Sequence, residues 1–462
     1  MAEEVKIEII SRETIKPSSP TPDHLKHYKL SLLDQLVRQS VYMSMVFFYP
    51  KIKDFPTNQT LLQRLKNSLS KTLTRFYPLA GRIKGNISID CEDDGVHFIE
   101  ARIHGFLSTF LQNLDKYSKL PEPFLPPKIE LLKPISLPLL VVQVSSFDCG
   151  GLAVALYMSH KFGDGATLSR FIKDWTSLSH GQSQTLLPPL DFKVSSRFPP
   201  SVFAVELPAD KSERAAVTAD KCVTRRYMFE ASKIANLRAK AAGINGSQLQ
   251  GKQPTRTEAI TALIWRCAMI ASRLNKGFSM HSVMHQLVNF RERVEPPFSK
   301  NSIGNFVQYF SIQLEAGMVE LPDLVCKFRR GIEEFGKKEA KRLGGDDWME
   351  EIFQSWKERK DISIREDTNL YTCTSLCGFG FSETDFGWGK PIWLSLDSGS
   401  FLNNFLLLTS TRDGDGVEAC VTLREEDMVL FELDPELLSF AYPSNPSSSL
   451  MSKIGGNHLS RL

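Results

Sequence analysis

The sequence predicts a mixed α/β protein made of two similar domains. Its 462 residues exceed what one hydrophobic core usually supports, so we expect two domains of roughly 200 residues each. Apolar runs typical of strands alternate with amphipathic stretches typical of helices in both halves of the chain. Between the halves, residues 177–219 are proline-rich, weakly patterned and predicted to be a linker. The predicted domains are therefore 1–176 and 220–442, followed by a disordered serine-rich tail at 443–462.

Composition and charge exclude several functional classes. The net charge is +3 and no long basic tract is present, so nucleic-acid binding is not expected. The chain begins without the basic and apolar segments of a signal peptide, and no run approaches about 18 apolar residues. The eight cysteines are scattered and complete no zinc-binding pattern, so we expect free thiols and no metal. These features predict a cytoplasmic, monomeric protein that does not enter a membrane.

The first half contains several strand and helix patterns ahead of its most informative segment. Strands are expected at 5–10 and 46–50, and apolar residues at helical spacing predict a helix over 61–76. Residues 87–90 and 96–101 are predicted to form a hairpin around an acidic turn.

A histidine follows the most apolar strand of the first half. Residues 139–147 and 152–158 predict two buried strands joined by a glycine turn, and a helix is expected over 166–175. His160 stands between the second strand and this helix. Imidazole titrates near neutrality, so it can accept a proton from a hydroxyl or an amine. A histidine at a strand end is nevertheless more often structural than catalytic, and the strand alone does not decide between the two.

The second half repeats the alternation of strands and helices. The predicted strands are 223–229, 283–290, 307–314 and 371–376, with a hairpin of 405–410 and 418–423 around the turn 413–416. The predicted helices are 231–242, one from 254 to about 270, and 323–343.

Two motifs give the sequence a resemblance to a known family. His160-Lys-Phe-Gly-Asp164 with Asp385-Phe-Gly-Trp-Gly389 far downstream resembles the signature pair of the plant BAHD acyl-CoA-dependent acyltransferases. The first string alone is weak evidence, but the second motif at this distance makes coincidence improbable. The segments 76–82 and 288–291 also look familial. The resemblance implies a chloramphenicol-acetyltransferase-like fold with an active-site channel between two domains, and it is greatest to the alkaloid-acylating branch.

The resemblance also implies catalytic roles. His160 would be the general base that removes a proton from the acceptor as it attacks the thioester. Asp164 would support His160 structurally by pairing with an arginine of 291–293, because a carboxylate held by arginine stays ionised and fixes its turn. Trp388 would donate its indole N–H to the developing oxyanion. No activated serine or cysteine lies in the motif, which favours transfer in a ternary complex without an acyl-enzyme.

For the co-substrate, the sequence suggests a candidate phosphate-binding helix start. Thr255, Arg256 and Thr257 at the beginning of a helix, with Asn305, suit contact with acyl-CoA because helix N-terminal N–H groups attract anions. The alternative is that Thr255 or Thr257 is simply a helix N-cap. No tightly bound cofactor is expected.

The remaining residues of the second motif favour a structural interpretation. Asp385 and Phe386 are predicted to form a loop away from the chemistry, held by a salt bridge and a packed ring. Gly387 and Gly389 are predicted to serve the backbone rather than a ligand.

The identity of the acyl group depends on one arginine. Arg424, at the end of the strand 418–423, could pair with the free carboxylate of malonyl-CoA, which acetyl-CoA lacks. Malonyl transfer is therefore a hypothesis, with acetyl transfer as its competitor. The acidic residues 425–427 offer Arg424 a surface charge cluster as an alternative environment.

The acceptor is not encoded in any motif. The resemblance implies a hydroxyl or amine of a plant specialised metabolite, with an alkaloid as the expected class. One alternative is a condensation enzyme acting on carrier-protein thioesters, although this chain has Ser159 where such enzymes usually carry a second histidine. Another is a binding protein that kept the fold without catalysis.

Overall fold

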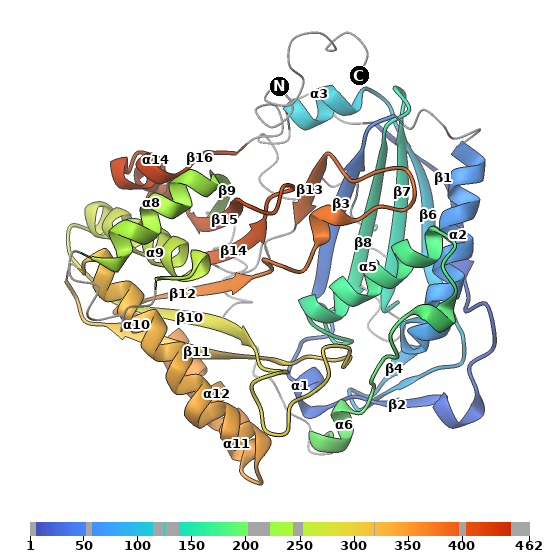
Figure 1. Cartoon of the computed structure of the whole chain (residues 1–462), viewed down its shortest axis with the longest axis horizontal. Helices are drawn as coiled ribbons and strands as arrows, with labels where there is room; N and C mark the ends of the chain where they lie inside the picture. The colour runs from blue at the N-terminus through green and yellow to red at the C-terminus, as the bar shows by residue number, and fades with distance from the viewer. Residues whose placement is uncertain are drawn as a thin grey trace.

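Two large β-sheets, each in its own lobe, form the framework of the protein (Figure 1). The computed structural model describes residues 6–51, 58–113, 124, 138–201, 222–243, 253–317, 319–396 and 403–444. The mixed α/β architecture of two lobes agrees with the fold predicted from the sequence.

The first lobe is built on a six-stranded sheet and a small three-stranded one. The order in the large sheet is β1 (Ile7–Ile15), β6 (Val96–Ile103), β7 (Leu140–Phe147), β8 (Leu152–Ser159), β3 (Tyr42–Tyr49) and β13 (Trp393–Leu396). The small sheet has the order β2 (His27–Lys29), β5 (Ser88–Asp90) and β4 (Arg82–Lys84). The helices of this lobe are α1 (Leu32–Gln35), α2 (Asn58–Arg75), α3 (Leu107–Gln112), α5 (Gly165–Ser179) and α6 (Val194–Arg197).

Strand β8 is buried on both faces, which explains its continuous apolar sequence. Leu156 belongs to the core that also contains Trp175 of α5, and Ala155 faces a second core on the other side of the sheet. A fully buried leucine side chain such as that of Leu156 contributes about 1.5–3 kcal/mol. The strand is therefore a rigid support for the residue that follows it.

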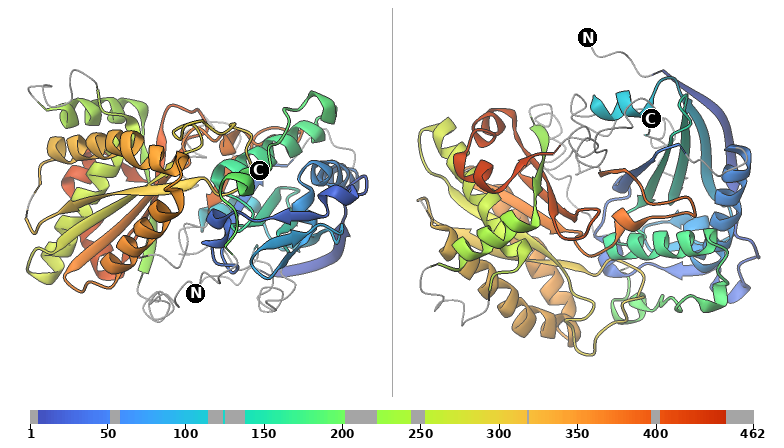
Figure 2. Two further views of the ribbon diagram at one scale, coloured as in Figure 1. Left: turned by 90° about the horizontal axis from the view of Figure 1, so that it is seen from below. Right: turned by 45° about the horizontal axis from the view of Figure 1, so that its top comes forward.

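The second lobe contains a seven-stranded sheet. Its order is β11 (Val307–Leu314), β10 (His281–Asn289), β12 (Thr368–Ser375), β14 (Phe405–Ser410), β15 (Val417–Arg424), β9 (Cys222–Phe229) and β16 (Tyr442–Pro443). The helices are α8 (Ala231–Ala242), α9 (Arg256–Lys276), α10 (Leu321–Glu334), α11 (Ala340–Gly344), α12 (Trp348–Ser363), α13 (Glu425–Phe431) and α14 (Pro435–Phe440). A π-helical turn, Phe335–Glu339, joins α10 to α11. Figures 1 and 2 show the antiparallel strands β10 and β11 extending from the second lobe to the first, and β10 is the one whose chain runs toward the first lobe.

The hairpin predicted for residues 87–101 is wrong. Strand β5 pairs with β2 and β4, whereas β6 pairs with β1 and β7 in the other sheet of the lobe. The acidic turn instead connects the two sheets, and Asp93 within it accepts hydrogen bonds from the backbone and hydroxyl of Thr21. The partners of β5 and β6 are set by pairing with strands that are distant in sequence, which the residues of the turn do not indicate.

The structure also revises the predicted domain boundary. Strand β13 belongs to the second half of the sequence, but it pairs antiparallel with β3 in the first sheet. The Asp385–Gly389 motif precedes this strand, so it lies on the first lobe and not in the predicted domain 220–442. Part of the predicted linker is ordered against the lobes: α6 lies within it, and residues 202–219 lie outside the described residues.

The predicted disordered tail begins too early. Tyr442 and Pro443 form β16, and the backbone N–H of Ser444 donates to the carbonyl of Arg226. Residues 445–462 lie outside the described residues. Across the part of the chain that the structure describes, no helix is both long and apolar enough to cross a membrane.

Candidate active site

His160 lies directly after β8, at the junction between the two lobes. Its backbone N–H donates to the carbonyl of Val41, 2.9 Å away, which continues the pairing between β8 and β3. Its imidazole Nδ1 lies 3.0 Å from Oδ1 of Asn305, which lies two residues before β11 of the second lobe. The strand and the neighbouring lobe together fix the position of this side chain.

Asn305 makes three further hydrogen bonds, two from its side-chain amide and one from its backbone N–H. Its Nδ2 donates to the carbonyl of His160 and to Oδ1 of Asp34, both at 2.9 Å, and its backbone N–H donates to the same Asp34 oxygen. Asn305 was predicted to contact CoA, but the structure assigns its side chain to the histidine. Nδ1 of His160 is thereby hydrogen-bonded, and Nε2 is the nitrogen left to act as a base.

Asp164 forms the predicted ion pair with the 291–293 segment. Arg291 donates to both carboxylate oxygens, at 2.7 and 2.9 Å, and both side chains are buried. The same carboxylate accepts from the backbone N–H of Thr167, capping α5, and from that of Phe306. Burial acts to raise the pKa of Asp164, but Arg291 and these N–H groups lower it below its ordinary value. The aspartate therefore joins the two lobes beside His160 and stays ionised.

Lys161, the second residue of the motif, is also buried at this junction. Its ammonium donates to the carbonyls of Asp34, Gln35 and Val37, at 3.2, 3.2 and 2.5 Å. These carbonyls lie at the C-terminal end of the short helix α1 and just beyond it, where a cation is favoured. Burial lowers the pKa of Lys161 to about 8, and the Asp34 carboxylate opposes this effect. Lys161 thus attaches α1 to the strand that carries the histidine.

Gly165 permits a segment of the second half to approach the histidine turn. A Cβ on Gly165 would lie 2.8 Å from Cδ2 of Leu376 and 3.2 Å from the Phe379 ring. These residues follow β12, so the exit of that strand closes against the start of α5. A larger residue at position 165 would push this segment away from the site.

The structure separates Trp388 from His160. Asp385, in the same loop, pairs with His180 at the C-terminal end of α5, whereas Asp164 caps the N-terminal end. A helix of 15 residues is about 22 Å long, so the two motifs lie at opposite ends of a long helix. The expected oxyanion contact of Trp388 is contradicted by this geometry.

The loop carrying Trp388 has the structural character predicted for its other residues. Oδ1 of Asp385 accepts hydrogen bonds from the backbone N–H groups of Gly387, Trp388 and Gly389 at 2.6, 3.0 and 2.9 Å. Burial acts to raise the pKa of Asp385, but these bonds and His180 bring it below the ordinary value. The ring of Phe386 packs 4.6 Å from that of Trp175. Both glycines have positive φ, which a side chain would disfavour.

The predicted CoA-contacting residues at the start of α9 are already engaged within the protein. Thr255 is the N-cap, with a capping box to Glu258, as the alternative interpretation held. Arg256 donates to the carbonyls of Gly414 and Asp415, both at 3.0 Å. Thr257 is half-buried in the first helical turn. These contacts are internal to the protein, and contact of the three residues with acyl-CoA stays a prediction.

Arg424 is the last residue of β15, at the end of the second sheet that lies away from the junction. The strand pairings through β12 and β14 place Thr422 of β15 at the same level of the sheet as His285 of β10. Because β15 runs away from the junction, Arg424 lies two residues farther from it than Thr422. Asn289, where β10 reaches the junction, is therefore about 20 Å away from the level of Arg424 at ~3.3 Å per residue. The Arg424 side chain is half exposed and lies 4.0 Å from Glu426. This placement contradicts an acyl-carboxylate contact and agrees with the surface cluster.

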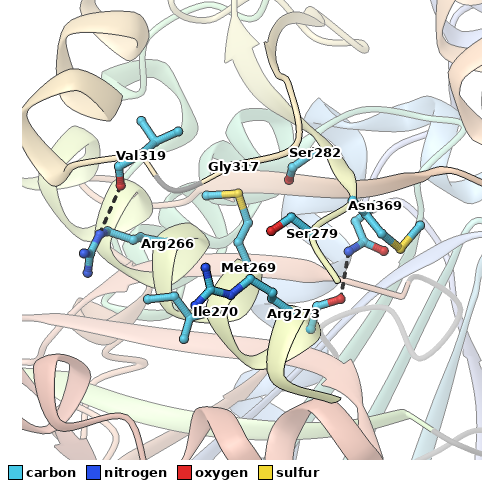
Figure 3. A pocket seen from close by; sticks show the side chains of 11 residues that line it. Arg266, Met269, Ile270, Arg273, Ser279, Ser282, Gly317, Val319 and Asn369 are labelled. Carbon is cyan, nitrogen blue, oxygen red and sulfur yellow. Dashed lines mark hydrogen bonds between the residues drawn. The ribbon is translucent and has the colours of Figure 1, made fainter. Parts of the chain in front are cut away.

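A small cavity elsewhere in the second lobe contains none of the predicted site residues (Figure 3). It lies beside the C-terminal half of α9, where Arg266 donates to the carbonyl of Val319 and Asn369 donates to Ser272. Among the residues that the structure describes, no cluster of histidine, cysteine or acidic side chains could hold a metal ion.

Asp34 and Lys161 are the site residues that motif analysis missed. The pattern Ser31-Leu-Leu-Asp34 is the available signal, because a serine followed three residues later by an acid is typical of a helix start. The structure confirms a capping box there. Nothing local indicates that Asp34 also binds Asn305.

The structure thus places His160 between two lobes of mixed α/β structure. Residues 5–438 match the Transferase family. A BAHD acyltransferase of Arabidopsis thaliana is 38% identical over 452 residues, covering 96% of this chain and 99% of the relative. Limonoid 7-O-acetyltransferase of Citrus sinensis is 37% identical over 457 residues, covering 94% of this chain and 98% of the relative.

A solved crystal structure is similar to this chain in both sequence and fold. The crystal structure of vinorine synthase is 34% identical and superposes with a TM-score of 0.78, covering 96% of this chain and all of that one. The protein therefore belongs to the BAHD transferase family and is an acyltransferase.

Proposed function

We propose that this enzyme transfers an acetyl group from acetyl-CoA to a hydroxyl or amine of a plant specialised metabolite. The observation that carries the proposal is the hydrogen bond between His160 Nδ1 and Asn305, which leaves Nε2 to act as a base at the lobe junction. A general base in this position activates a hydroxyl or amine nucleophile. Acyl-CoA as the donor is supported by the family resemblance.

The reaction needs no group beyond the two substrates and His160. Nε2 takes the proton of the acceptor O–H or N–H as the acceptor atom attacks the thioester carbonyl. The tetrahedral intermediate then collapses, the carbon–sulfur bond breaks, and the CoA thiolate leaves. The imidazolium returns the proton to that thiolate, which restores the base. Asp164 holds the turn and takes no part in proton transfer, since Arg291 and backbone N–H groups occupy its oxygens.

Two observations support acetyl rather than malonyl as the acyl group. The similarity to a 7-O-acetyltransferase favours acetyl. The distance of Arg424 from the junction removes the feature that favoured malonyl. It stays a prediction that CoA contacts Thr255, Arg256 or Thr257. It also stays a prediction that the acceptor is an alkaloid.

A screen of donors against acceptors tests the proposal. Wild-type enzyme is incubated with acetyl-CoA or malonyl-CoA and a panel of alcohols and amines, and products are identified by intact mass. We expect acetylated products, and a loss of about 100- to 10,000-fold in kcat for His160→Ala. Arg424→Ala is the donor control, and its ratio of acetyl to malonyl transfer should equal that of wild type.

Three outcomes contradict specific parts of the proposal. Preferred malonyl transfer that is lost in Arg424→Ala overturns the acetyl assignment. An acylated enzyme formed with donor alone overturns the ternary mechanism. Full activity of His160→Ala overturns the role of the base.

A further inference from the structure

A second carboxylate beside the catalytic histidine is fully buried and accepts four hydrogen bonds. Oδ2 of Asp34 accepts from the backbone N–H and the hydroxyl of Ser31 at 2.9 and 2.7 Å. Oδ1 accepts from the backbone N–H and the side-chain Nδ2 of Asn305, both at 2.9 Å. The first pair caps α1, and the second pair reaches across to the other lobe. One carboxylate therefore orders both the helix start and the residue that touches His160.

The Asn305 amide can take only one orientation between its neighbours. Its Nδ2 faces the Asp34 carboxylate and the main-chain carbonyl of His160, which are both acceptors. Turning the amide over would place its oxygen against these two oxygens. The amide oxygen is therefore held toward the histidine ring.

A fixed amide orientation selects one tautomer of the histidine. The Asn305 oxygen can only accept, so Nδ1 of His160 must carry the proton at their 3.0 Å contact. Nε2 then carries the lone pair that a general base requires. Without this constraint a neutral imidazole populates both tautomers, and the fraction with a protonated Nε2 cannot take the acceptor proton through that atom.

We propose that Asp34 is a positioning residue that fixes the base-competent tautomer of His160 through the Asn305 amide. The inference rests on the proposed role of His160 as the base. Asp34 does not touch His160 through its carboxylate, and it acts through Asn305. Lys161 strengthens the arrangement because its ammonium binds the last carbonyls of α1, including that of Asp34.

The tautomer is measured directly by NMR on enzyme labelled with ¹⁵N in its histidines, with His160→Asn used to assign the signals. Wild type should show His160 protonated at Nδ1, and Asp34→Ala should show a mixture of both tautomers. The kcat should fall by about 10- to 100-fold, with little change in the KM for acetyl-CoA. Asn305→Ala should show the same tautomer mixture and a similar fall in kcat. The kcat of the double variant should be little lower than that of either single variant, because both residues act through the same hydrogen bond to His160.

A matched control separates tautomer selection from general destabilisation. Asp434→Ala removes the aspartate that caps α14 in the second lobe, and should change neither tautomer nor kcat. If Asp34→Ala does not fold, Asn305→Ala carries the test. The proposal is overturned if wild type is protonated at Nε2, or if folded variants keep the Nδ1 tautomer. The spectra need no substrate, so a failed acetyl-transfer assay with the expected tautomer shift would reject the proposed function alone.

Discussion

The two motifs place one aspartate at each end of α5. The two aspartates differ in burial and in their hydrogen-bond partners. Asp164 at the N-terminal end is buried and paired bidentately with Arg291 of the other lobe. Asp385 at the C-terminal end is one-third exposed and accepts hydrogen bonds mainly from its own loop. The difference shows that motif membership does not imply proximity to the chemistry.

The Asp385 loop nevertheless has a clear structural effect. It bonds to His180 and packs Phe386 against Trp175, just before β13 joins the first sheet. The loop therefore ties the C-terminal half of the chain back onto the first lobe. Asp164 joins the two lobes at the site, whereas Asp385 holds its loop to the opposite end of α5 within the first lobe.

The largest effect on stability is expected from breaking the junction at Asp164. Asp164→Ala leaves Arg291 buried without its partner, which should cost about 3–5 kcal/mol in the free energy of unfolding. Replacing both residues, as in Asp164→Leu with Arg291→Met, should recover part of this loss. Urea unfolding followed by circular dichroism measures both. A loss below about 1 kcal/mol in Asp164→Ala would mean that the pair does not hold the lobes together.

Lys161 provides a pH-dependent test of the same junction. Its pKa is about 8 in the folded protein and should return to 10.5 in the unfolded chain. Between these values the unfolded chain binds the proton that the folded protein has released, so stability rises with pH. Relative to Lys161→Met, the wild-type free energy of unfolding should increase by about 3 kcal/mol from pH 8 to 10.5.

Denaturant midpoints for both proteins at several pH values provide this measurement. A constant difference across that range would show that the carbonyls of Asp34, Gln35 and Val37 keep the ammonium charged. The Asp164 carboxylate, whose pKa is lowered, stays ionised in this range and adds no pH dependence to the free energy of unfolding.

The smallest effect on catalysis is expected at the distant loop. Trp388→Phe keeps an aromatic ring beside Tyr49 and Phe386 but removes the indole N–H. Because the loop lies at the far end of α5, kcat should stay within about twofold of wild type. Steady-state kinetics with the identified acceptor measures this. A drop of about 100-fold or more would return Trp388 to the oxyanion role.

The sequence predicted most elements because their signals are local. The apolar run of β8, the glycine turn before it and the amphipathic faces of α2 and α5 all depend on neighbouring residues, and the structure contains each of them. The failures involve partners that are remote in sequence. The strands predicted as a hairpin pair in different sheets, and β13 crosses to the first lobe.

The same division holds within the active site. The sequence by itself determined His160 at a strand end, the helix that follows Asp164, and the family through its two motifs. Only the tertiary structure decided that Asn305 and Asp34, 271 residues apart, meet beside that histidine. It also decided that Trp388 and Arg424 do not. Residue types and local spacing set which hydrogen bonds are possible, but packing of the two sheets sets which donors and acceptors come within 3 Å.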